Sequence, residues 1–222
     1  MSTPVATPER PLRRDAERNR QRIIDAARIV FAERGLRASH DDIAREAQVG
    51  VGTVYRRFPD KEQLIDALFE EAMERIAAIA EEALAMEDPW EGLVHFIVGG
   101  QELQCADRGL KELMLSNERG AERVAQARSR ILPLGVRLMT RAQEAGVVRD
   151  DISFTDVPLL QIGVGAITDA TRDVAPETWR RTLTILLDGL RASRDTTRPL
   201  TQPPLSLEQF DTVMQAGAPR RR

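Results

Sequence analysis

The chain has 222 residues, of which 42% are hydrophobic and 30% are charged. This length suffices for one large or two small globular domains, and the composition is that of a soluble protein. Uncharged stretches such as Val157 to Thr168 are shorter than the roughly 18–20 apolar residues that span a bilayer, so no membrane partner is expected. The N-terminus lacks the apolar run of a signal peptide, and the single Cys105 cannot form an internal disulfide, which favours a cytoplasmic location.

The net charge of −3 is unevenly distributed along the chain. Residues 1–62 contain 13 basic and 10 acidic side chains, a net charge of +3, whereas the remainder carries −6. A basic N-terminal part suits a polyanionic partner, and an acidic remainder does not. The charge pattern therefore places any nucleic-acid contact in the first third of the chain.

Residues 1–13 hold three prolines among serine and threonine, and we expect a disordered arm there. A helical pattern begins at about Arg14 and ends at Gly35, since glycine favours the position after a helix. Its apolar residues recur on one helical face. These residues are Ile23, Ile24, Ala27, Val30 and Phe31.

Residues 39–58 have the pattern of two short helices joined by a tight glycine-containing turn. Ser39 is a good N-cap, and Val54 and Phe58 form an apolar pair four residues apart on the second helix. Two helices joined in this way form a helix-turn-helix, whose second helix enters the major groove of DNA. That second helix carries side chains suited to phosphates and base edges, namely Thr53, Tyr55, Arg56 and Arg57.

The rest of the chain also has helical periodicity. A long helix is expected at 61–85, followed by helices from Pro89, at 110–115, and at 121–145 with a kink or local adjustment at Pro133. Two more helices are expected near 155–173 and 176–193. The sequence predicts an all-α fold with four parts: the arm at 1–13, a DNA-binding head at 14–75, a helical domain at 76–195, and a tail at 196–222 with a short helix at 206–215.

The head resembles the TetR family of bacterial transcriptional regulators. The matching runs are 24–35, 42–47 and 49–64, and the last reads VGVGTVYRRFPDKEQL. The resemblance implies a three-helix DNA-binding head that a long helix joins to a larger ligand-binding and dimerisation domain. It also implies contacts with double-stranded DNA through Ser39, His40, Val51, Gly52, Thr53, Tyr55, Arg56, Arg57 and Lys61.

Among these residues, the resemblance gives Thr53, Tyr55 and Lys61 phosphate contacts and places Arg56 within reach of a base edge, where arginine pairs with guanine. Ser39 and His40 are further phosphate candidates. The chain departs from the family pattern at three positions. Gly50 stands where serine is common, Arg57 where tyrosine or histidine is usual, and Gln48 where a turn glycine is common.

One recognition helix binds weakly, and a symmetric dimer reads two half-sites. Two apolar stripes on the last two expected helices are candidates for a homodimer interface; in a TetR-like architecture these helices pair with their copies. The alternative is that both stripes only close the core of one chain. The interface candidates are Leu160, Val164, Ile167, Trp179, Leu183, Leu186, Leu187 and Leu190.

A small-molecule effector is expected among the middle helices, where polar residues interrupt apolar faces. The pocket candidates are Phe96, Gln101, Cys105, Met114, Asn117, Met139, Gln143 and Gln161. An effector that favours the conformation unable to bind DNA would release a repressor from a palindromic operator. A repressor is the expected role, and activation is also open, because the motif shows DNA binding and not the position of the operator.

The sequence gives little support to an enzyme. It has no glycine-rich phosphate loop, no HExxH pattern, no nucleophile elbow and only two histidines, so we expect no catalytic residue, metal site or cofactor. The alternative function is a helical protein-interaction scaffold with a degenerate DNA-binding head. Specific, salt-dependent DNA binding would distinguish the two.

Overall fold

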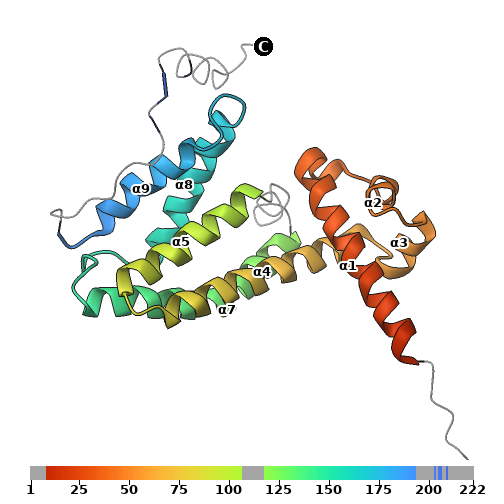
Figure 1. The fold of residues 1–222 in the computed structure, drawn as a ribbon, viewed down its shortest axis with the longest axis horizontal. Helices are drawn as coiled ribbons and strands as arrows, with labels where there is room; N and C mark the ends of the chain where they lie inside the picture. The colour runs from red at the N-terminus through yellow and green to blue at the C-terminus, as the bar shows by residue number, and fades with distance from the viewer. Residues whose placement is uncertain (1–8, 107–117, 194–202, 204, 207–208, 210–222) are drawn as a thin grey trace, which may run out of the picture. The chain divides into compact units, whose positions relative to one another are not determined.

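The computed structural model describes residues 9–106, 118–193, 203, 205–206 and 209 (Figure 1). In these ranges the regular elements are helices, and the one isolated β-bridge joins Val148 to Arg191. The predicted all-α fold is therefore confirmed. The expected helix at 110–115, most of the expected arm, and nearly all of the expected helix at 206–215 lie outside the described residues.

The chain divides into two compact units. The head unit comprises Met1–Ala72 with Ala106–Val124, and the helical unit comprises Met73–Cys105 with Ala125–Arg222. The division after Ala72 is close to the boundary expected from the sequence at residue 75. The segment Ala106–Val124 belongs to the head unit although it follows much of the helical unit along the chain.

Helix α1 spans Glu9–Arg34 and so begins earlier than the expected Arg14. Pro11 falls in its first turn, where backbone N–H groups have no partner within the helix, so proline costs no helical hydrogen bond there. At the other end Gly35 has a φ of +61° and starts the short 3-10 turn η1, Gly35–Arg37. The proline cluster at the N-terminus is thus compatible with helix from residue 9 onward.

Three more helices complete the described head: α2 (His40–Glu46), α3 (Val51–Arg57) and the first turns of α4 (Lys61–Ala85). The apolar positions of the predicted stripe on α1 are buried against those of α2, α3 and α4. Each such side chain contributes roughly 1.5–3 kcal/mol by leaving water. The largest buried members are Ile23, Ile24, Phe31, Ile43, Val54, Phe58, Leu64, Ile65 and Leu68.

The corner between α2 and α3 is held by backbone hydrogen bonds. Val49 N donates to Ala44 O at 3.0 Å, and Gln48 has a φ of +54°. This left-handed conformation is one that glycine adopts without cost and glutamine does not. Arg22 of α1 donates to the Ala47 carbonyl at 2.8 Å and so closes the end of α2. The corner therefore has the expected geometry without the glycine usual in it.

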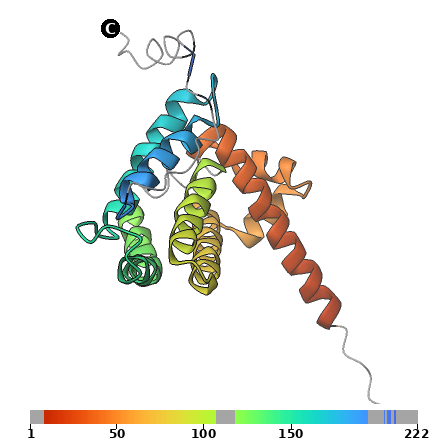
Figure 2. The same cartoon turned by 60° about the vertical axis from the view of Figure 1, so that its left-hand side comes forward.

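The helical unit contains the rest of α4 with α5 (Pro89–Ala106), most of α7 (Glu118–Glu144), α8 (Asp156–Thr171) and α9 (Thr178–Leu190). Helix α7 continues through Pro133, where a kink or local adjustment was expected. Helices α8 and α9 lie side by side in both views (Figures 1 and 2). None of the described helices combines the length and the apolar character required to cross a membrane.

Close packing in the helical unit depends on two glycines. A Cβ on Gly135 of α7 would lie 1.9 Å from Cζ of Phe154, whose ring is only 7% exposed and packs against Phe96 at 6.0 Å between centroids. A Cβ on Gly92 of α5 would lie 2.5 Å from the Ala83 carbonyl oxygen. Both contacts are too short for any side chain, so these positions require glycine.

The C-terminal end of α4 is closed by Arg141 of α7. Its guanidinium donates to the carbonyl oxygens of Leu84, Met86 and Glu87 at 3.0, 2.5 and 2.9 Å. The last carbonyls of a helix have no partner within it, and a cation there also interacts favourably with the helix dipole. Arg141 therefore fixes the turn that leads from α4 to α5.

Candidate nucleic-acid interface

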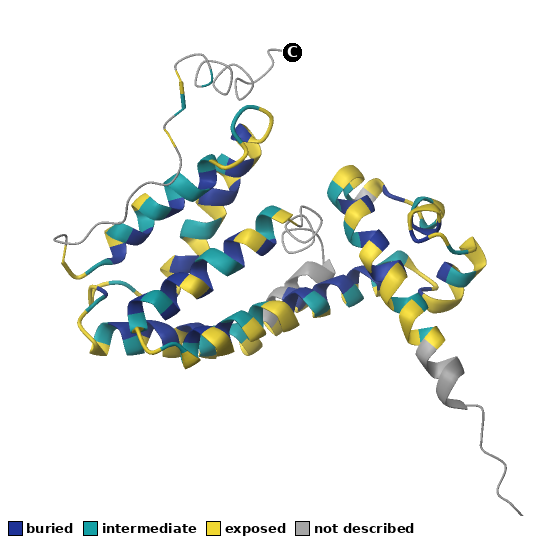
Figure 3. Ribbon diagram, in the orientation of Figure 1, coloured by how far each residue is buried: buried dark blue, intermediate teal, exposed yellow. Residues whose placement is uncertain are grey.

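The recognition helix α3 has one buried edge and one broad exposed face. Val54 within α3 and Phe58 after it are buried in the head core. The opposite face is largely exposed, as the burial colours of the head show (Figure 3). It presents Val51, Gly52, Tyr55 and Arg56. The sequence expected Val54 and Phe58 to build the head, and both are buried there; the other four are exposed, and their contact with DNA stays a prediction.

Helix α2 begins with a capping box. The Ser39 hydroxyl accepts from Asp42 N at 3.2 Å and donates to Asp42 Oδ2 at 2.7 Å, while Ser39 N donates to the same carboxylate at 3.0 Å. These hydrogen bonds from Ser39, and then the charges of Arg34 and Arg45, lower the pKa of Asp42. The hydroxyl that the resemblance gave to a phosphate thus already caps α2.

Thr53 and Arg56 are linked on the exposed side of α3. Arg56 Nη2 donates to Thr53 Oγ1 at 3.3 Å, so the two side chains proposed to meet DNA lie together. Arg57 is exposed at the last residue of α3. Gly50 is the N-cap and gives no side-chain hydrogen bond to α3, whereas its carbonyl oxygen accepts from Thr53 N at 2.8 Å.

Lys61 is the first residue of α4 and lies half-buried. Its ammonium is 5.6 Å from the centroid of the Phe31 ring. Desolvation by burial lowers the pKa of Lys61, and the nearby Glu62 opposes that effect. The structure therefore places the Lys61 ammonium near a buried ring of the head core, and its phosphate contact stays a prediction.

His40 and Tyr55 meet across the corner between α2 and α3. Their rings are stacked, with centroids 4.6 Å apart and planes inclined by 14°. His40 Nε2 lies 3.2 Å from the Phe58 carbonyl oxygen, just after α3. The sequence did not predict this contact, because it joins residues from two helices with no common periodicity.

Arg123 of α7 joins the start of α4 inside the head unit. Its Nε donates to Asp66 Oδ1 at 2.7 Å and its Nη2 to Glu62 Oε2 at 3.0 Å. The Arg123 side chain is only 5% exposed. Desolvation alone would lower its pKa, but the hydrogen bonds and charges of Asp66 and Glu62 together raise it. Arg123 is thus a fixed positive charge that holds α7 against α4.

Six of the eight pocket candidates lie in the described ranges, and Met114 and Asn117 lie outside them. Phe96 and Met139 are core residues. Gln143 donates to the carbonyls of Arg149 and Ile152 at 3.0 and 2.8 Å, which fixes the loop after α7. Its amide is therefore committed to the fold.

Two of the remaining candidates form a polar pair at the α5–α8 contact. Gln101 is fully buried, and its Nε2 lies 3.6 Å from Cys105 Sγ, which in turn lies 3.7 Å from Thr168 Oγ1. Gln101 Oε1 is buried and accepts no hydrogen bond from any residue that the structure describes. This pair therefore leaves one buried oxygen of the helical unit without a described hydrogen-bond donor.

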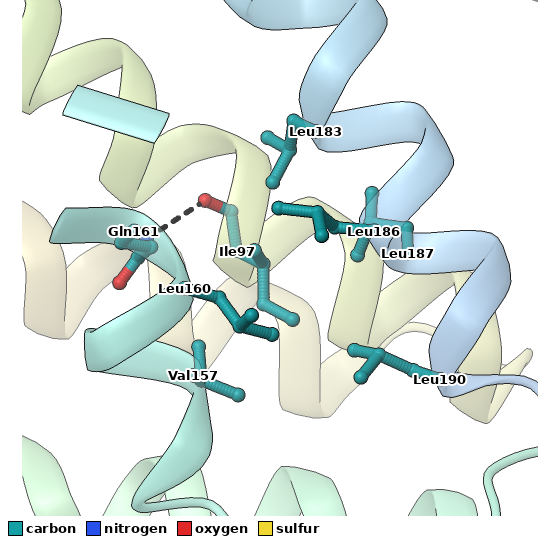
Figure 4. A pocket seen from close by; sticks show the side chains of 8 residues that line it. All are labelled: Ile97, Val157, Leu160, Gln161, Leu183, Leu186, Leu187 and Leu190. Atoms are coloured by element: carbon teal, nitrogen blue, oxygen red, sulfur yellow. Dashed lines mark hydrogen bonds between the residues drawn. The ribbon is translucent and has the colours of Figure 1, made fainter. Parts of the chain in front are cut away.

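A small apolar cavity lies between α5, α8 and α9 (Figure 4). Its volume of about 10 Å³ is at the lower limit for one water molecule. Gln161, the last pocket candidate, lies at its edge and donates to the Ile97 carbonyl at 3.1 Å. The other lining residues are Ile97, Val157, Leu160, Leu183, Leu186, Leu187 and Leu190.

The stripes predicted as a dimer interface are largely inside one chain. Five of the eight residues are 0–4% exposed: Val164, Trp179, Leu183, Leu187 and Leu190. Leu160 and Leu186 pack partly buried against the same core, and Ile167 is half-buried. This placement agrees with the alternative that the two stripes close the core of one chain. Side chains buried to this extent within one chain are not accessible to a second chain.

Helices α8 and α9 also carry apolar side chains on the sides turned away from the core. Leu159, Ile162 and Ile185 are 67%, 51% and 53% exposed. Gly163, Ala166 and Gly189 on the same two helices are also exposed. We call these six residues the outward face. A helix with apolar residues on both sides is expected to pack against its own core on one side and against a second partner on the other. The sequence of α8 has this pattern, so the second contact could have been predicted from it.

Known proteins match both parts of the chain. Residues 23–68 match the family described as bacterial regulatory proteins, tetR family, and residues 88–192 match the SbtR-like transcriptional regulator C-terminal domain. The HTH-type transcriptional regulator UidR of Escherichia coli (strain K12) is 29% identical over 171 residues, which cover 73% of this chain and 87% of UidR.

Solved structures agree with the sequence matches. A TetR transcription regulatory protein from Mycobacterium vanbaalenii has 34% identity and a TM-score of 0.61, over 82% of this chain and 99% of that one. A TetR transcriptional regulator from Streptomyces coelicolor has 31% identity and a TM-score of 0.61, over 78% and 98%. The chain belongs to the TetR family of bacterial transcriptional regulators and carries the DNA-binding domain of that family.

Proposed function

We propose that the chain is a cytoplasmic repressor that binds a palindromic operator as a homodimer and is released by a small molecule. The observation that carries the proposal is the exposed face of α3, where Tyr55 and Arg56 stand outside a core closed by Val54 and Phe58. A short helix with such a face and a basic end fits the major groove. We assign base readout to Arg56 and phosphate contacts to Thr53, Tyr55, Arg57 and Lys61.

The test is to select operators from random duplex DNA with the parent protein and then compare two variants. Arg56→Ala is expected to lose preference at one base pair of each half-site, by about 1–3 kcal/mol. Arg57→Ala is expected to weaken binding to all sequences and to reduce the slope of log affinity against log salt by about 0.9. Failure of the parent to enrich any sequence, or to bind DNA in a salt-dependent way, would favour the interaction scaffold.

Gly52 separates head stability from DNA binding. A Cβ at this position meets nothing within 4 Å, so Gly52→Ala is expected to stabilise the free head by up to about 1 kcal/mol through helix propensity. Because the same methyl group would stand on the DNA-facing side of α3, operator affinity is expected to fall about tenfold, the cost of one steric misfit. Thermal unfolding measures the stability of the head, and gel-shift titration measures operator affinity. An increase in both stability and affinity would show that Gly52 does not lie in the DNA interface.

The outward face of α8 and α9 is the surface that we propose for homodimerisation. Several large apolar side chains exposed on two neighbouring helices commonly mark an interface, and the glycines among them permit close approach of two helix pairs. Ile162→Glu is expected to give monomers in sedimentation velocity and to lose operator binding. Val136→Glu is the matched control, since Val136 is 44% exposed on α7 outside this face. A dimer that survives Ile162→Glu would exclude the outward face.

We propose that the effector binds in the helical unit near Gln101, Cys105 and the cavity beside Gln161. The buried Gln101 oxygen and the apolar lining support a ligand that is mostly apolar with one polar group, and the cavity of about 10 Å³ has to widen to admit it. The FadR regulator of Bacillus subtilis, crystallised with stearoyl-CoA, is similar in fold alone at 22% identity. Arg123 of α7 holds the start of α4. An effector that changes this contact would lower the population of the conformation that binds DNA.

A further inference from the structure

The recognition helix α3 is weakly specified by its own sequence. It has seven residues, includes Gly52, and starts at the N-cap Gly50, which forms no side-chain cap. Val54 is its one buried residue. Helices shorter than about 12 residues are not stable in isolation, and glycine costs each of them more. The pose of α3 on the head therefore depends on contacts from outside the helix.

His40 makes two such contacts from the first turn of α2. Its ring lies against the Tyr55 ring, with the 4.6 Å centroid distance and small inclination of a stacked pair. Its Nε2 lies 3.2 Å from the Phe58 carbonyl oxygen, and since a carbonyl only accepts, Nε2 is the donor in this hydrogen bond. One side chain thus contacts α3 at its middle and just after its end.

Tyr55 needs this support because the head core gives it little. Its side chain is 51% exposed, so a free ring would turn about its first side-chain torsion and its hydroxyl would sample several positions. A ring stacked on one face keeps the hydroxyl in one direction. Fixing a contact group before binding increases affinity, because less conformational freedom is lost in the complex.

We propose that His40 is a positioning residue of the DNA interface, which orients the Tyr55 hydroxyl toward a phosphate and itself makes no phosphate contact. The proposal rests on the proposed function and replaces the direct contact that the family resemblance implied for His40. The ring of His40 is half-buried, one face is covered by Tyr55, and its Nε2 proton is used at Phe58. While Nε2 donates to Phe58, a phosphate could be met only through Nδ1, which in the neutral ring accepts a hydrogen bond and so does not bind a phosphate oxygen.

The test uses variants that separate the two contacts of His40. His40→Phe keeps an aromatic face and loses the hydrogen bond, whereas His40→Gln keeps a donor and loses the ring. Tyr55→Phe keeps the stack and removes the hydroxyl. Operator affinity is expected to fall about tenfold in Tyr55→Phe, as for loss of one hydrogen bond to a charged group, and similarly in His40→Gln, with a smaller loss in His40→Phe.

The double variant His40→Gln/Tyr55→Phe is expected to bind no more weakly than the weaker of the two single variants. If His40 acts only by orienting the Tyr55 hydroxyl, replacing His40 has no further effect once that hydroxyl is absent. The slope of log affinity against log salt is expected to stay unchanged in all of these variants, since no charge is removed. Arg57→Ala, which removes a charge, is the control that lowers this slope by about 0.9. Additive losses, or a lower slope in His40→Gln, would show a direct phosphate contact and overturn the proposal.

A measurement on the free protein separates this proposal from the function of the whole chain. Tyr55 is the one tyrosine of the sequence, so its ring protons have unique NMR signals. Ring-current shifts of these protons are expected in the parent and in His40→Phe, and they are expected to be lost in His40→Gln. A parent that shows the shifts but binds no DNA would refute the proposed function alone. Tyr55 signals that are insensitive to residue 40 would refute the positioning role.

Discussion

Gly135→Ala is expected to lower the free energy of unfolding of the helical unit by about 2–4 kcal/mol. The new methyl group would overlap Cζ of Phe154, which lies 1.9 Å from an ideal Cβ, so the ring must leave its site beside Phe96. Loss of a buried phenylalanine costs about 3–5 kcal/mol, and the better helix propensity of alanine returns about 1 kcal/mol. Denaturant unfolding followed by the fluorescence of Trp90 and Trp179 reports on this unit alone, since both lie within it.

Two comparisons isolate the clash as the cause. Gly163→Ala on α8 is the matched control when both changes are made in the monomeric Ile162→Glu background, because a Cβ there meets nothing within 4 Å in its own chain and the change is expected to stabilise by up to about 1 kcal/mol. In the Gly135→Ala background, Phe154→Leu is expected to restore part of the lost stability by removing the overlapping atoms. Unchanged stability in Gly135→Ala would mean that Phe154 has a second position of equal energy.

Arg141→Met is expected to destabilise the helical unit by about 2–3 kcal/mol. Methionine retains most of the apolar stem but leaves the carbonyls of Leu84, Met86 and Glu87 without their charged donor. A hydrogen bond from a charged group contributes about 1.5–3 kcal/mol when buried, and water replaces part of that at this half-exposed site. The cation also stabilises the C-terminal end of α4 by about 0.3–1 kcal/mol.

The same tryptophan fluorescence measures the effect of Arg141→Met. Arg137→Met, one turn earlier on α7 and exposed, is expected to change the free energy of unfolding by less than about 0.5 kcal/mol, as for most surface substitutions. Equal effects of the two substitutions would show that overall charge, and not the cap on α4, determines stability here.

The periodic parts of the head were predictable because local signals agreed there. The stripe from Ile23 to Phe31 is buried as expected, and α4 has its expected bounds, Lys61–Ala85. Its start is fixed by Asp60, whose Oδ1 accepts from Gln63 N at 2.8 Å. The apolar spacing of α4, the N-cap Asp60 and the preceding Pro59 all indicate the same helix start. Such agreement between local signals makes an element predictable from the sequence.

Partners of side chains were harder to predict than helices. Periodicity shows that Leu183 and Leu187 share a face, but not whether their own chain or a second one covers it. Polar residues are equally ambiguous. Ser39 caps α2 as its position predicted, although the resemblance also gave it a phosphate contact, and Gln143, expected in the ligand pocket, closes a loop. The His40–Tyr55 stack depends on tertiary geometry that no spacing along the chain encodes.

The buried Arg123 limits how heads can be exchanged between relatives. The helix-turn-helix match ends at residue 68, yet the arginine that neutralises Glu62 and Asp66 comes from α7. A chimera that takes residues 1–72 from another regulator must therefore bring acidic residues at both positions, or it leaves a buried cation unpaired at a cost of about 3–5 kcal/mol. When heads are exchanged between regulators, the unit that must be transferred or matched includes Arg123 and not only the residues of the helix-turn-helix motif.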